Sequence, residues 1–137
     1  MRREGVLTAI AALVLLVGCD DILFNAGEEV VTDAEGFAGV QAIVDTKCLG
    51  CHSAAGAPGA YDLDLETDLH GAIVGVTGGY GVVLVEPGDP GASMFFQKVT
   101  NTQDAGNGSD MPIGSGGLPA EEAQIVEEWI LDGAPLE

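Results

Sequence analysis

Apolar residues recur at helical spacing near both ends of the region that follows residue 32. In the first segment, Thr32 and Glu35 have the spacing of a capping box, which predicts a helix from about Asp33 to Lys47. In the last segment, a helix is predicted to open at Pro119 and to end at Gly133. The apolar stripes consist of Phe37, Val40, Ile43 and Val44 in the first helix and of Ile125, Val126, Trp129 and Ile130 in the last.

Shorter elements are predicted between these two helices. Thr67 or Asp68 is expected to cap a brief helix through Val74, and Asp89-Pro90 is typical of the start of a third helix that reaches about Asn101. Residues 62–66 alternate between acidic residues and Leu, and residues 82–85 are apolar, so both are expected to be extended. The pattern therefore predicts an all-α, loop-rich domain of about four short helices.

The composition suggests that this domain needs a cross-link or a bound group to stabilise its fold. The chain has 137 residues, of which 21 are Gly, but only 4 Phe, 2 Tyr and 1 Trp. A domain of this size with few large side chains has a thin core and commonly relies on a disulfide, a metal or a cofactor. The net charge of −18 argues against nucleic-acid binding, which requires a basic surface.

The N-terminus has the features of an export signal. Met1-Arg2-Arg3 is basic, and the apolar run over residues 6–17 is too short to span a bilayer. Leu16-Val17-Gly18-Cys19 resembles the lipobox of bacterial lipoproteins, and this resemblance implies cleavage before Cys19 and lipid attachment to it. The alternative is an uncleaved anchor in which Cys19 has no special role.

The lipoprotein interpretation divides the chain into three parts. Residues 1–18 are the signal peptide, residues 19–32 are the acylated Cys with a flexible acidic tether, and residues 33–137 are the folded domain. Without the signal peptide, Lys47 and Lys98 are the remaining cationic side chains, so an exported chain is strongly acidic.

Cys48-Leu49-Gly50-Cys51-His52 is a C-x-x-C-H sequence, the attachment motif of c-type haem. Two thiols one helical turn apart reach the two vinyl groups on one porphyrin edge, and the adjacent imidazole reaches the iron. Two alternatives use the same residues. A thioredoxin-like dithiol would need a βαβ context, and a zinc site would need further ligands from Cys19 and His70.

The second axial ligand is predicted to be Met111. This residue lies in a polar, Gly-rich loop next to Pro112, where core packing is a poor explanation for a methionine. Met94 and His70 are the alternatives, and an open iron position is a third. His/Met ligation favours electron transfer, whereas an open position favours ligand binding.

With these motifs, the chain resembles the monohaem, class I-like cytochromes c, and in particular the planctomycete-type cytochrome c domain. The resemblance implies an all-α cytochrome c fold, one covalent haem c, His52 and Met111 as axial ligands, and Phe37 and Trp129 where the terminal helices pack. The last helix is acidic where relatives often carry Arg, so docking surfaces are not transferred. The matching segments are Cys48–His52, Leu63-x-Leu65, 86–90 with Ser93, Met111-Pro112, 127–130 and 133–135.

The expected function is that of an exported, membrane-anchored electron carrier rather than an enzyme. Its acidic surface favours redox partners with a basic docking face. The haem propionates are expected to face solvent or to bind Trp129, Tyr61 or Tyr80, since the exported chain is poor in cations. The alternatives are a haem-based sensor and an interaction subunit of a surface complex in which haem mainly stabilises the fold.

Overall fold

A computed structural model of the chain describes residues 35–55 and 63–137. The expected signal peptide, Cys19, the tether, Thr32 and Tyr61 lie outside the described residues. The described part is mostly helical and contains isolated β-bridges but no sheet, which confirms the all-α class. Its helices are α1 (Gly36–Lys47), α2 (Leu49–His52), α3 (Leu69–Ile73), η1 (Pro90–Ala92), α4 (Met94–Val99), η2 (Ala105–Asn107) and α5 (Ala120–Leu131).

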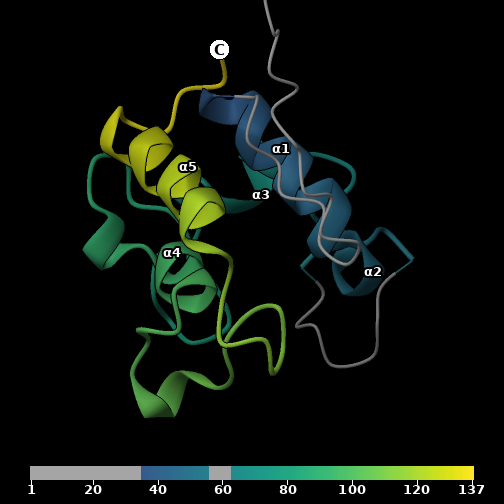
Figure 1. Ribbon diagram of the computed structural model, residues 1–137, viewed down its shortest axis with the longest axis vertical. Helices are drawn as coiled ribbons and strands as arrows, with labels where there is room; N and C mark the ends of the chain where they lie inside the picture. The colour runs from purple at the N-terminus through teal and green to yellow at the C-terminus, as the bar shows by residue number, and fades with distance from the viewer. Residues whose placement is uncertain (1–34, 56–62) are drawn as a thin grey trace, which may run out of the picture.

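The two long helices, α1 and α5, form the main helix–helix contact, with α4 against α5 (Figure 1). Phe37 on α1 lies against Trp129 on α5, with 5.8 Å between the ring centroids, so the terminal helices pack where expected. The predicted apolar stripes thus face one core. Its buried members are Val40, Ile43, Val44, Leu65, Leu69, Ile73, Val85, Val99, Val126, Trp129, Ile130 and Ala134.

The two longest helices begin slightly later than the sequence predicts. Glu35 is the N-cap residue of α1 and is extended, so the helix starts at Gly36; Thr32 and Asp33, where the sequence predicts its start, lie outside the described residues. Helix α5 starts at Ala120, directly after Pro119, and Gly133 follows its end with φ of +94°. Asp68 caps α3 as expected, because its side chain accepts a hydrogen bond from the Gly71 amide at 2.9 Å.

The predicted third helix is interrupted at Ser93. Asp89 caps the short helix η1, and Ser93 then adopts an extended conformation before α4 begins. Ser93 is fully buried, and its hydroxyl donates to Asp89 O at 2.7 Å while it accepts from Glu86 N at 2.9 Å. These two bonds fold the chain back locally and replace a continuous helical ladder.

The segment expected to be extended at 82–85 lies between α3 and α4, whereas residues 63–66 of the other such segment precede α3. Val74 pairs with Val85 and Thr77 pairs with Val83, so residues 74–85 double back on themselves as a loop. Of the apolar run at 82–85, Val85 is fully buried and the others are partly buried. None of the helices in residues 35–55 and 63–137 has the length and apolar character that crossing a bilayer requires.

Candidate functional site

The C-x-x-C-H sequence lies at the junction of α1 and α2. Cys48 ends α1, with its amide donating to Val44 O at 2.9 Å, and it also precedes α2. The amides of Cys51 and His52 both donate to Cys48 O, at 3.0 and 2.9 Å. The three functional residues are therefore held on one helical turn, the arrangement that their spacing predicts.

A cavity of about 310 Å³ lies beside this turn. Cys48, His52 and Met111 all line it, so residues that are far apart in the sequence meet at one place. Cys51 is exposed and lies at the surface instead. The other lining residues are Leu63, Leu65, Val76, Thr77, Gly78, Gly79, Tyr80, Leu84, Met94, Phe95, Lys98 and Val99.

The imidazole of His52 is fixed by a main-chain acceptor. His52 Nδ1 lies 3.3 Å from Leu63 O, and a carbonyl can only accept, so Nδ1 carries the proton of this hydrogen bond. This tautomer leaves the lone pair on Nε2, the atom that a metal would use. The Leu65 amide donates to His52 O at 2.9 Å, so the 63–65 segment holds this residue through both side chain and main chain.

The Cys48 thiol is not activated as a nucleophile. Burial first, and then the negative charge of Glu122, raise the pKa of Cys48 from 9.0 to about 11. Reactive dithiols instead have a lowered thiol pKa, because the thiolate is the attacking species. The thioredoxin-like alternative is therefore disfavoured, and residues 35–55 and 63–137 also contain no β-sheet to provide its usual context.

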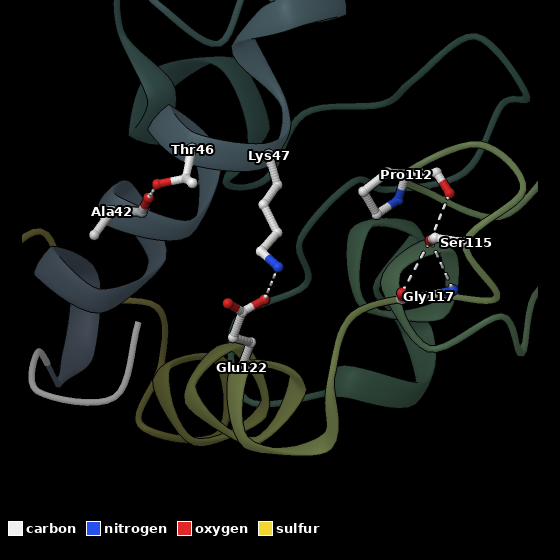
Figure 2. A network of polar contacts seen from close by, with 7 residues as sticks. All are labelled: Ala42, Thr46, Lys47, Pro112, Ser115, Gly117 and Glu122. Atoms are coloured by element: carbon white, nitrogen blue, oxygen red, sulfur yellow. Dashed lines mark hydrogen bonds and ion pairs between the residues drawn. The ribbon is translucent and has the colours of Figure 1, made fainter. Parts of the chain in front are cut away.

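An ion pair between Lys47, the residue before Cys48 in the sequence, and Glu122 links α1 to α5 (Figure 2). Lys47 Nζ is 3.3 Å from Glu122 Oε2, and the Glu122 side chain is fully buried. Glu122 was not among the residues singled out from the sequence. Its place in the apolar stripe, three or four residues before Ile125 and Val126, was the signal that it faces inward.

Met111 lies in a loop that folds back on α4. Its amide donates to Lys98 O at 2.9 Å, and the Leu118 amide donates to Val99 O at 2.7 Å, so both arms of the loop bond to the same helix end. Asp110 closes the loop, since the Gly116 amide donates to its carboxylate at 2.6 Å and thereby holds the pKa of Asp110 below its usual value.

Further bonds within the same loop involve Ser115. Its hydroxyl lies 2.7 Å from Pro112 O and 2.9 Å from Gly117 O (Figure 2). Met111 itself is half-buried. Several hydrogen bonds within the loop and to α4 therefore fix the position of Met111.

Met94 and His70, the two alternative axial ligands, differ in where they lie relative to the cavity. Met94 is buried and lines the same cavity as His52, so it stays in reach of a group bound there. His70 does not line the cavity: its Nε2 lies 2.9 Å from Ala134 O, and its ring packs edge-on against Phe37 at 5.5 Å. His70 is thus a structural residue of the α1–α5 contact.

Of the residues expected to bind the haem propionates, Trp129 and Tyr80 lie in different parts of the structure. Trp129 Nε1 donates to Pro135 O at 2.8 Å, and this residue belongs to the core and is not among the residues that line the cavity. Tyr80 lines the cavity, together with Lys98, whose amino group lies 5.1 Å from the Tyr80 ring centroid. Lys98 was identified from the sequence only as one of two remaining cations, and its place in this wall was not predicted.

A zinc site finds no support here. In the part of the chain that the structure describes, no three His, Cys, Asp or Glu side chains gather as a metal-binding group. A haem iron needs fewer protein ligands, because the porphyrin supplies four nitrogens, and one imidazole and one thioether at a largely apolar cavity suit it. Comparisons with family models, with curated proteins and with solved structures found no match to this chain.

Proposed function

We propose that this protein is an exported, lipid-anchored c-type cytochrome that carries single electrons through one covalent haem. The observation that carries the proposal is the meeting of Cys48, His52 and Met111 at one cavity. Met111 is 59 positions from His52 in the sequence and lies in a separate loop, so the two residues are not brought together by local chain geometry.

The residues at and next to the cavity fit a haem in their chemistry. Cys48 at the cavity and Cys51, exposed on the same helical turn, would form the thioethers, in which each thiol adds its sulfur to one vinyl carbon and its hydrogen to the other. His52 Nε2 and the Met111 sulfur would be the axial ligands, one nitrogen and one soft sulfur donor. When bound, the haem supplies an iron that gains and loses one electron.

The surrounding chain would control how the bound group behaves. Leu63 O fixes the His52 tautomer and increases the electron density at Nε2. Apolar side chains such as Leu65, Phe95 and Val99 line the cavity and exclude water. Because a dry site and a thioether ligand both disfavour the more highly charged ferric form, the expected reduction potential is higher than for bis-His ligation.

The location of the protein is part of the same proposal. The basic start, the short apolar run and Cys19 support export and attachment to a bacterial membrane through lipid, since several acyl chains anchor a soluble domain stably. Thioether attachment of haem outside the cytoplasm agrees with that route. The net charge of −18 supports redox partners with a basic docking face.

The deciding experiment is an absorption and pyridine-haemochrome spectrum of the full chain made in a bacterial host with c-haem maturation. One haem per chain that resists acid–acetone extraction is expected, because thioethers are covalent. The matched variant Cys48→Ala/Cys51→Ala should lose the covalent haem. A cooperatively folded wild-type protein without haem would overturn the proposal.

A further inference from the structure

Lys98 is a buried cation between the cavity and residues 106–111, here named the Met111 loop. Only 8% of Lys98 is exposed, and it lines the cavity together with Met111. Its amino group donates to Ser109 O at 2.7 Å and to Asn107 O, and it lies over the Tyr80 ring. Two carbonyls and one aromatic face therefore replace the water that an ammonium group loses on burial.

The main chain of the same residue holds Met111 directly. The Met111 amide donates to Lys98 O at 2.9 Å. Lys98 thus holds Met111 through its main-chain carbonyl. Through its amino group it also holds the carbonyls of Asn107 and Ser109, which precede Met111 in the loop. Both contacts start from the last turn of α4, which packs against α5 and the core.

Gly108 shows how closely the Met111 loop packs on this lysine. Its φ of +77° favours glycine, and a Cβ at this position would collide with the Tyr80 hydroxyl and lie 3.4 Å from Lys98 Nζ. Gly106 in the same segment is different, because a Cβ there would meet nothing within 4 Å. The chain therefore uses glycine at 108 where the loop touches Tyr80 and Lys98.

The charge of Lys98 is directed at main-chain carbonyls of one loop. An ordinary surface cation would not need these acceptors, whereas a loop that must hold one side chain at a cavity gains from them.

We propose that Lys98 is the positioning residue that holds Met111 at the iron, an inference that rests on the proposed cytochrome function. Lys98 does not bind the iron. It orders the Met111 loop, so that the Met111 sulfur stays at the cavity and competes with external ligands for the sixth position. Loss of the Lys98 amino group weakens this ligation while His52 and both thioethers stay in place.

The test compares Lys98→Leu and Gly108→Ala with two control variants in the haem-loaded full chain. Lys98→Leu removes the donor, and Gly108→Ala disturbs the same contact from the loop side. Gly106→Ala is the control within the same segment. Val126→Ala is the control for lost stability, because Val126 is a fully buried residue of α5 that does not line the cavity.

Three measurements are made on each protein. Carbon monoxide affinity of the ferrous form reports how easily Met111 is displaced, and the long-wavelength ferric band reports the methionine–iron bond. Hydrogen exchange of the Met111 amide reports loop order without reference to haem chemistry. In Lys98→Leu and Gly108→Ala we expect about a tenfold rise in carbon monoxide affinity, with about tenfold faster exchange, from the loss of charge-assisted hydrogen bonds.

The outcomes separate the two proposals. Wild-type-like values in both controls together with altered values in Lys98→Leu and Gly108→Ala support the role of Lys98. If the variants carry haem and keep the wild-type carbon monoxide affinity and exchange rate, the role of Lys98 is overturned and the cytochrome proposal stands. If the wild-type chain carries no haem, both proposals fail.

Discussion

Lys47 Nζ lies 3.3 Å from Glu122 Oε2, and this pair bridges α1 and α5 one residue before Cys48. The Glu122 side chain is fully buried and that of Lys47 is 13% exposed. Desolvation of two charges offsets much of their attraction, so the pair itself adds little net stability. Its importance is that neither partner can be removed alone.

Glu122→Ala is expected to lower the free energy of unfolding by about 3 kcal/mol, because it leaves a largely buried ammonium group without its carboxylate. Chemical denaturation of the haem-loaded protein measures this change. The exposed neighbour variant Glu121→Ala is the control and should change the free energy by less than about 0.5 kcal/mol. The double variant Lys47→Leu/Glu122→Leu should recover most of the loss, and failure to recover would mean that the pair matters for more than charge balance.

In the cytochrome proposed above, Met111→Ala is expected to remove the long-wavelength ferric band and to allow tight carbon monoxide binding, since it would leave the sixth iron position open. Met94→Leu preserves volume in the same cavity and should keep both properties of the wild type. If Met94→Leu loses the band and Met111→Ala keeps it, Met94 is the ligand. If the wild-type protein already binds carbon monoxide without displacing a ligand, the sensor interpretation is favoured over the carrier.

His70→Ala should lower the free energy of unfolding by about 2 kcal/mol without changing the haem spectrum. The variant loses the hydrogen bond from Nε2 to Ala134 O and the edge-on contact with Phe37. Spectroscopy and denaturation of the same sample separate the two effects. A changed spectrum would revive bis-His ligation.

Much of this fold follows from local patterns in the sequence. Val40, Ile43 and Val44 are spaced for a helix and are buried in α1. Val126 and Trp129 have the same kind of spacing and are buried in α5. Asp68 and Asp89 are caps because their short carboxylates accept main-chain amides three residues on. Such features depend on neighbouring residues alone, so the sequence is sufficient to predict them.

The features that were not predicted depend on side-chain contacts that helical spacing does not encode. Ser93 interrupts the predicted third helix because its hydroxyl bonds to Asp89 O and Glu86 N, and helical propensity does not contain that choice. Lys98 lies buried because the 107–109 carbonyls come to it from another segment. The meeting of His52 with Met111 was expected from chemistry and resemblance, and the residue periodicity alone would not place them together.

The turn that supports His52 should make stability depend on pH. Asp64 accepts from the Thr67 hydroxyl at 2.6 Å and from the Glu66 amide at 2.9 Å, between the two residues, Leu63 and Leu65, that bond to His52. The Thr67 bond, first, and the Glu66 bond, second, lower the pKa of Asp64 in the folded protein. A lowered folded pKa means that this stabilisation is complete above the unfolded value of about 3.9 and is lost as the pH falls through the folded pKa.

Asp64→Asn and Thr67→Val should therefore lower the denaturation midpoint near neutral pH, and the difference from the wild type should shrink on acidification. The measurement is the denaturant midpoint of each haem-loaded protein at about pH 6 and about pH 3, on either side of the unfolded carboxyl pKa. Asp104→Asn is a suitable control, because the Asp104 side chain makes no capping bond to η2. A difference of equal size at both pH values would contradict this account, since it would show that the turn is held by its shape and not by the charge of Asp64.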